Sequence, residues 1–106
     1  AAYADEHSIP LISSMGTGNK LHPELFRISD LKDTSVCPLC RVMRKELKTR
    51  GIQSLKVCWS PEKPLTPAPA EEDTGSRRST PGSISFVPPA AGLMIAGEIV
   101  RNICGL

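Results

Sequence analysis

The chain has few aromatic side chains and almost no excess of charge. Four of its 106 residues are aromatic, namely Tyr3, Phe26, Trp59 and Phe86, so few large side chains are available to fill a core. The formal net charge is +2, which is too small to indicate nucleic acid as a partner by itself. With 40% apolar and 23% charged residues, the composition is that of one small domain with a modest core.

The sequence also lacks a long hydrophobic run. The longest uncharged stretch, residues 79–97, has its apolar part at residues 82–97, which is shorter than the roughly 20 residues that cross a bilayer, and Pro88 and Pro89 interrupt it. Residues 1–10 contain two acids and no cationic region before an apolar stretch, so they do not read as a signal peptide. We therefore expect a cytoplasmic protein with no membrane partner. Because residues 1–7 resemble the end of a helix and no Met precedes them, we expect a piece of a longer protein.

Motifs that would complete a catalytic site are absent. There is no phosphate-binding glycine loop with its lysine, no H-E-x-x-H, and no carboxylate pair at suitable spacing. Gly16-Thr17-Gly18 lacks the third glycine and the following helix of a dinucleotide-binding fingerprint. The residues by themselves indicate an α/β piece without catalytic residues.

The first apolar run ends in a polar loop. Residues 8–15 are apolar and bounded by turn formers, which predicts a short strand buried on both faces. The loop at residues 16–19 then follows the carboxyl end of this strand, where ligands bind in open α/β sheets. A plain turn that uses glycine for a positive φ is an equally good interpretation.

Two alternating segments flank one amphipathic segment. Residues 25–31 alternate with Phe26 and Ile28 on one face, and residues 54–60 alternate as well, so both are predicted to be half-exposed strands. Between them an amphipathic helix is predicted, which ends before Gly51. Its apolar face has Leu39, Val42, Met43 and Leu47, and its basic face has Arg41, Arg44, Lys45 and Lys48. A helix followed by a strand suggests a βαβ-like unit.

The rest of the chain divides into a linker and an apolar end. Residues 60–80 are rich in proline and acids, which predicts a flexible crossover between residues 1–59 and residues 81–106. Residues 81–106 read as one strand that leads into one buried helix. Because this helix is apolar around most of its circumference, we expect several side chains to pack against structure outside the chain or against a second copy. They are Phe86, Leu93, Ile95, Ile99 and Ile103.

Cys37 and Cys40 have the C-x-x-C spacing of metal and redox sites. A structural zinc ion needs four ligands, and neither Cys58 and Cys104 nor the two histidines supply a second pair. The two residues therefore remain weak metal candidates, and small buried cysteines are the favoured interpretation. A redox pair is less favoured, because the motif does not directly follow a predicted strand and no aromatic residue precedes it.

Two groups of cations are candidates for phosphate contact. Arg77 and Arg78 form a pair close to the last predicted strand and are the sharper candidate for binding phosphate or RNA. The basic face of the predicted helix is more typical of a solvated surface, since Glu46 interrupts it.

Two segments together resemble a known family. Residues 9–52, which include ISSMGTGNKL, and residues 77–101, which include TPGSISFVP, resemble the C-terminal part of the ThiF/MoeB/HesA family, relatives of ubiquitin-activating enzymes. The branch that dehydrates a threonylcarbamoyl-modified tRNA adenosine matches best. The resemblance implies the C-terminal portion of a Rossmann-like α/β fold, with a mixed sheet and two main helices, which is incomplete on its own.

The resemblance also implies a function. Family members adenylate a carboxylate with Mg-ATP and usually form homodimers, and this branch cyclises its modified tRNA. The family's ATP and metal residues lie upstream of Ala1, so we expect no cofactor on this chain and no catalysis by it alone. Candidate partners are tRNA, a second copy, and a sulfur-carrier protein or cysteine desulfurase. The implied substrate-side loop comprises Ser13, Ser14, Met15, Gly16, Thr17, Gly18, Asn19 and Lys20.

The family gives little support for a role of the cysteines. Some relatives have a sulfur-accepting cysteine where this chain has Thr80, and zinc-binding relatives have two C-x-x-C pairs where this chain has one. Two alternatives to the enzyme fragment stay open: a non-catalytic module that binds RNA or a sulfur-carrier partner, and a small zinc-stabilised domain.

Overall fold

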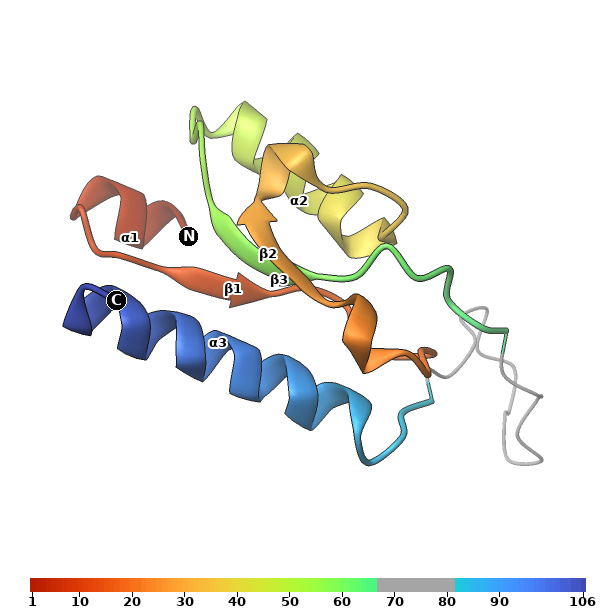
Figure 1. Ribbon diagram of the computed structural model, residues 1–106. Helices are drawn as coiled ribbons and strands as arrows, with labels where there is room; N and C mark the ends of the chain where they lie inside the picture. The colour runs from red at the N-terminus through yellow and green to blue at the C-terminus, as the bar shows by residue number, and fades with distance from the viewer. Residues whose placement is uncertain (67–81) are drawn as a thin grey trace.

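The computed structural model describes residues 1–66 and 82–106, which form three layers (Figure 1). A sheet lies between two longer helices, α2 and α3, one on each of its faces. The elements in chain order are α1 (Ala2–Glu6), β1 (Ile12–Ser14), the 3-10 helix η1 (Pro23–Leu25), β2 (Arg27–Asp30), the 3-10 helix η2 (Leu31–Asp33), α2 (Pro38–Thr49), β3 (Lys56–Trp59) and α3 (Val87–Cys104). None of the helices in the described ranges is both long and apolar enough to span a bilayer.

The sheet is mixed, as the fold class predicted, with β3 in its centre. Its order is β1-β3-β2: β3 runs parallel to β1 and antiparallel to β2. Ser13 of β1 and Ser29 of β2 both lie opposite Val57 of β3. The predicted βαβ-like unit needs correction, because the two strands on either side of α2 are antiparallel. The parallel pair is formed by β1 and β3, which are separated by β2 as well as α2.

The central strand β3 begins with the exposed Lys56 and is buried on both faces from Val57 onward, so its predicted half-exposed character was wrong for that part. Leu55, Val57 and Trp59 share one face, as their alternation predicted, and pack against α2. Cys58 points to the other face, where it packs with Phe26, Val87 and Ala91. The sequence pattern of a half-exposed strand arises here because a small cysteine replaces the polar residue that a solvated face would carry.

The strand β1 also differs from its prediction. It has three residues, of which Ile12 and Ser13 are half-buried and Ser14 is exposed, whereas burial on both faces was expected. Among the described strands it pairs with β3 alone, so it lies at an edge of the sheet. Ile9 and Leu11, just before it, are exposed.

The helix α2 forms where it was predicted and ends before Gly51, which has a φ of +72°. Its buried side is rotated from the prediction: Cys40 is fully buried and Leu47 nearly so, whereas Leu39 and Val42 are 44% and 57% exposed. The reason is that the helix lies across β3 with Cys40 against the sheet. Leu39, one residue earlier, is turned toward solvent.

The strand predicted before the last helix is not present in the described residues. Residues 82–86 form a loop and a turn, and α3 begins at Val87 with Pro88 and Pro89 in its first turn. Proline is tolerated there because the first N–H groups of a helix have no partner within it. Within this chain the helix buries only Val87 and Ala91, whereas Leu93 and Ile103, two of the side chains expected to pack outside the chain, are 74% and 80% exposed.

The burial pattern of α2 yields a matched pair of substitutions. Leu47→Ala should lower the free energy of unfolding by about 2–5 kcal/mol, because the side chain lies in the core beneath the helix. Leu39→Ala, in the same helix, should lower it by less than about 1 kcal/mol, because its side chain is partly in water. Urea denaturation of the two variants measures both values. Equal losses would show that the helix packs by the face that its sequence pattern suggests.

Candidate functional site

The predicted substrate-side loop, residues 13–20, lies at the carboxyl edge of the two parallel strands. β1 ends at Ser14 and β3 ends at Trp59, and because the strands are parallel both lead into loops at the same edge. Residues 60–65 follow β3 there. The structure thus brings the predicted loop to the part of the sheet where ligands bind in open α/β folds.

The start of the loop extends the sheet. Met15 is buried, and its N–H donates to the carbonyl of Cys58 at 2.8 Å, which continues the pairing of β1 with β3. Ser14 is exposed, and its hydroxyl donates to the carbonyl of Met15 at 3.3 Å. Ser13, Gly16, Thr17, Gly18 and Asn19 are half-buried. The loop therefore presents small polar groups over a buried methionine.

Lys20 is the unusual member of the loop, because it is a lysine with only 4% of its surface exposed. Its Nζ donates to the carbonyl of Gly16 at 2.9 Å, which closes the loop upon itself. A Cβ atom placed on Gly16 would lie 3.7 Å from Lys20 Nζ and 3.7 Å from Cys37 Sγ. The loop thus packs directly against the N-terminus of α2.

Asn19 connects the loop to two distant segments. Its N–H donates to the carbonyl of Gly82 and its Oδ1 accepts from the N–H of Gly82, both at 2.8 Å. Its carbonyl accepts from the N–H of Leu65 at 2.7 Å. Asn19 has a φ of +58°, whereas neither Gly16 nor Gly18 has a positive φ. Residues 18 and 19 form a turn whose left-handed residue is Asn19 and not one of the two glycines.

Glu62 is a residue of this region that sequence reasoning missed. Its two carboxylate oxygens accept from the N–H groups of Leu21 and His22 at 2.8 and 2.9 Å, across about forty positions of sequence. Ser60, fully buried, accepts from the N–H of Glu62 at 3.1 Å. A lone acid in a proline-rich segment carries no pattern that would have indicated this contact.

The remaining candidates are distributed as follows. Cys37 and Cys40 lie together at the start of α2, but within residues 1–66 and 82–106 no three His, Cys, Asp or Glu side chains form a metal-binding group. Arg77 and Arg78 lie outside the described residues. On the basic face of α2, Arg44 is used structurally: its Nη1 donates to the Thr34 carbonyl at 3.0 Å and to the Thr34 hydroxyl.

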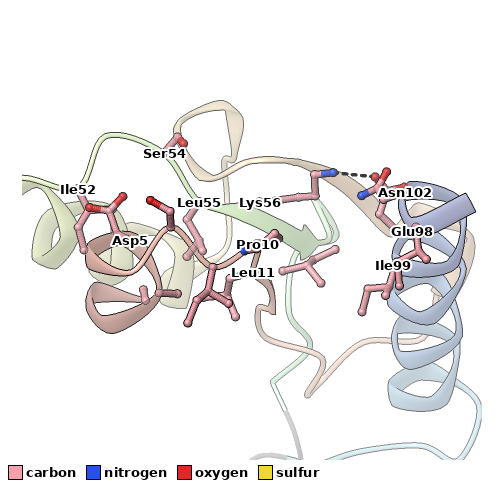
Figure 2. Close-up of a pocket in the computed structure, with 16 residues that line it drawn as sticks. Asp5, Pro10, Leu11, Ile52, Ser54, Leu55, Lys56, Glu98, Ile99 and Asn102 are labelled. Carbon is pink, nitrogen blue, oxygen red and sulfur yellow. Dashed lines mark hydrogen bonds and ion pairs between the residues drawn. The ribbon is translucent and has the colours of Figure 1, made fainter. Parts of the chain in front are cut away.

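A separate apolar groove lies at the opposite end of the sheet (Figure 2). It has a volume of about 980 Å³ and is bordered by the segment before β1, the start of β3 and the C-terminal half of α3. Lys56 and Glu98 form an ion pair of 2.9 Å across it, and Leu11 and Ile99 contribute apolar walls. The groove does not include residues 13–20, so this hollow and the predicted loop are distinct places.

Comparison with known proteins identifies relatives of one kind. The chain is 34% identical over 107 residues to the tRNA threonylcarbamoyladenosine dehydratase of Bacillus subtilis, which covers 92% of this chain and 42% of the relative. It is 44% identical over 77 residues to tRNA threonylcarbamoyladenosine dehydratase 2 of Saccharomyces cerevisiae, covering 66% of this chain and 17% of the relative. The chain therefore spans less than half of the length of these relatives. No family model matches the chain.

Solved structures agree with these relatives on the fold. The tRNA N6-threonylcarbamoyladenosine dehydratase of E. coli superposes with a TM-score of 0.81, and its complex with AMP superposes with a TM-score of 0.79. The match covers 98% of this chain and 42% of the E. coli protein at 21% identity. The mixed sheet with its two main helices is therefore the C-terminal part of that fold.

Two substitutions of Asn19 separate the contribution of its left-handed backbone to the stability of the loop from that of its side-chain hydrogen bond. Asn19→Ala should cost about 2–4 kcal/mol, because alanine tolerates the left-handed conformation less well than asparagine and because the Gly82 N–H loses its acceptor. Asn19→Gly should cost about 1–2 kcal/mol less, because only the side-chain acceptor is lost. Asn102→Ala, on exposed α3, is the control and should change little. Urea denaturation tests this, and equal costs for the two Asn19 variants would contradict a role for its backbone.

Proposed function

Since this chain is homologous to the C-terminal part of the tRNA threonylcarbamoyladenosine dehydratases, which are ThiF/MoeB-type proteins, we propose that it forms the substrate side of such an enzyme. The parent protein would use ATP to activate the threonylcarbamoyl carboxylate of a modified tRNA adenosine, which then cyclises. The observation that supports this most strongly is the 34% identity over 92% of the chain to a relative of that name.

The proposal divides the work between this chain and the rest of the protein. The described residues contain no glycine-rich phosphate loop and no group of three metal ligands, so they do not by themselves fit ATP with Mg²⁺. Solved structures of the E. coli relative contain AMP and ATP. We therefore assign nucleotide and metal binding to the part of the relatives' length that this chain does not span. The chain alone is then inactive.

The loop at residues 13–20 is proposed to line the acceptor side of the cleft. Its position at the carboxyl edge of β1 and β3 supports this, as does its half-buried hydroxyl at Thr17. The many contacts that hold it, through Lys20, Asn19 and Glu62, keep its polar groups in one arrangement. Such fixed positioning is what an adenylating enzyme requires, since it must align a carboxylate with the reacting phosphate.

The parent enzyme is further proposed to be a cytoplasmic homodimer. The side of α3 that faces away from the sheet carries an apolar stripe formed by Leu93, Ala96, Val100 and Ile103, all exposed among the described residues. A second copy seated on this stripe would remove it from water. tRNA is the proposed substrate partner, and a sulfur-carrier protein or cysteine desulfurase stays a further candidate partner.

Substitution of Thr17 in the full-length protein tests the function and the loop together. Thr17→Val keeps the side-chain shape but removes the hydroxyl, so kcat/KM for the modified tRNA should fall by about tenfold, the effect of one lost hydrogen bond. ATP affinity, measured by calorimetry, should not change. Thr49→Val removes a hydroxyl that donates to Glu46 at the exposed end of α2 and should leave both values unchanged.

The same activity assay tests whether ATP binding and catalysis need the part of the protein that this chain does not span. The 106-residue chain alone should show no ATP-dependent cyclisation and no tight ATP binding. ATP-dependent turnover by this chain alone would refute the proposed division. RNA binding by the chain, without any turnover by the full-length protein, would instead support the non-catalytic module.

A matched pair of substitutions in α3 tests the proposed homodimer. Ile103→Asp introduces a charge into the exposed apolar stripe and should shift the full-length protein from dimer to monomer in sedimentation velocity, because a buried unpaired carboxylate is costly. Asn102→Asp introduces the same charge one residue earlier and should leave the dimer intact. A dimer that tolerates Asp at position 103 would place the interface elsewhere.

A further inference from the structure

The start of α2 holds two thiols in one enclosed site. Cys37 is the N-cap of the helix and Cys40 lies in its first turn, with exposed fractions of 2% and 0%. Residues three apart in a helical turn lie on one side of it, at a separation close to the Cα spacing of natural disulfides. Both thiols belong to the core cluster that also contains Met15 and Trp59. Cys37 and Cys40 can therefore be joined with little movement of the backbone.

The two thiols differ in acidity. Burial opposes ionisation of Cys37, but N–H groups of Cys40, Gly16 and Leu39 and the thiol of Cys40 together hold the pKa of Cys37 below its ordinary value. Burial and the neighbouring Cys37 raise the pKa of Cys40 to about 11. Cys37 is therefore the more acidic thiol of the pair, and it is the one that attacks when it loses its proton.

The substrate-side loop packs on Cys37. Lys20 Nζ and Cys37 Sγ each lie 3.7 Å from the same point above Gly16, so they are no more than twice that distance apart. Lys20 and Cys37 are both buried, and the backbone of Gly16 lies between them. The Cys37 sulfur is therefore part of the surface on which the loop rests.

We propose that Cys37 and Cys40 are a reversible dithiol–disulfide pair whose oxidation releases the loop at residues 15–20. The oxidant belongs to the class of small-molecule disulfides. The Cys37 thiolate attacks one sulfur of that disulfide, which forms a mixed disulfide and expels one thiolate. Cys40 loses its proton to that thiolate and attacks Cys37 Sγ, which expels the second thiolate. Two protein thiols are oxidised and one disulfide is reduced to two thiols.

The structure places a strand and its loop beside the C-x-x-C motif, although no strand directly precedes this motif in the sequence. The C-x-x-C motif does not follow a strand in sequence, but the loop after β1 packs on it in space, at Gly16. Because this loop covers Cys37, exchange occurs only when the loop moves away. Once the disulfide has formed, Cys37 Sγ is bonded to Cys40, and the packing of Gly16 on this sulfur is disturbed. The proposal rests on the positions of these groups and not on the proposed enzyme activity.

The test uses the chain with the exposed Cys104 replaced, Cys104→Ser, so that three thiols remain. The folded protein is equilibrated with mixtures of reduced and oxidised dithiothreitol, quenched in acid and alkylated. Two of the three thiols should be lost together as the mixture becomes more oxidising. Trypsin should release the disulfide within residues 33–41, a peptide that contains both cysteines. Mapping this peptide in the protein without further substitution keeps the test independent of whether a variant folds.

The control variants and the loop readout complete the experiment. Cys37→Ser and Cys40→Ser should each abolish the disulfide, whereas Cys58→Ser, on the other face of the sheet, should leave the transition unchanged. Amide exchange at Gly16 should rise by about tenfold in the oxidised protein, because the loop opens more often once its packing on Cys37 is disturbed. Retention of all three thiols in the most oxidising mixture, a disulfide that includes Cys58, or unchanged exchange at Gly16 would overturn the proposal.

Discussion

The burial of β3 on both faces is the constraint on which the rest of the structure depends. Val57 and Cys58 are 0% and 1% exposed on opposite faces, and each anchors one helical layer. Both hydrogen-bond ladders of the sheet also run through this strand. Because β3 pairs in parallel with β1, the loops after the two strands meet at one edge, and the Cys58 carbonyl holds Met15 at the start of the candidate loop. The position of the site follows from this pairing.

The candidate loop has more connections than its small polar residues suggest. Asn19 binds Gly82 and Leu65, Glu62 binds the backbone after Lys20, and Gly16 packs on Cys37, the N-cap of α2. These contacts join segments up to 63 positions apart. A loop held from three sides can present its polar groups in one arrangement, as substrate positioning requires. It is equally sensitive to a change in any of these contacts, and the Cys37 thiol is the contact that oxidation can alter.

Local patterns predicted local structure well and packing less well. The alternation around Phe26 and Ile28, and around Val57, identified β2 and β3 correctly, because the two-residue period of a strand depends only on adjacent residues. The helical spacing identified α2 but not its buried side, since a shift of one residue rotates a helix by about 100°. The expected strand within residues 82–87 failed because strand-forming residues need a neighbour to pair with, and Pro88 and Pro89 favour the start of a helix instead.

The sequence by itself determined the kind of protein: its relatives, its mixed α/β class and the stretch that forms the loop are all readable from residues near one another in the chain. Only the tertiary structure decided which groups meet. The hidden ammonium of Lys20, the contact of Glu62 and the meeting of Gly16 with Cys37 depend on how β1 docks beside β3. That docking brings together residues that are distant in sequence, and no periodicity along the chain carries information about such contacts.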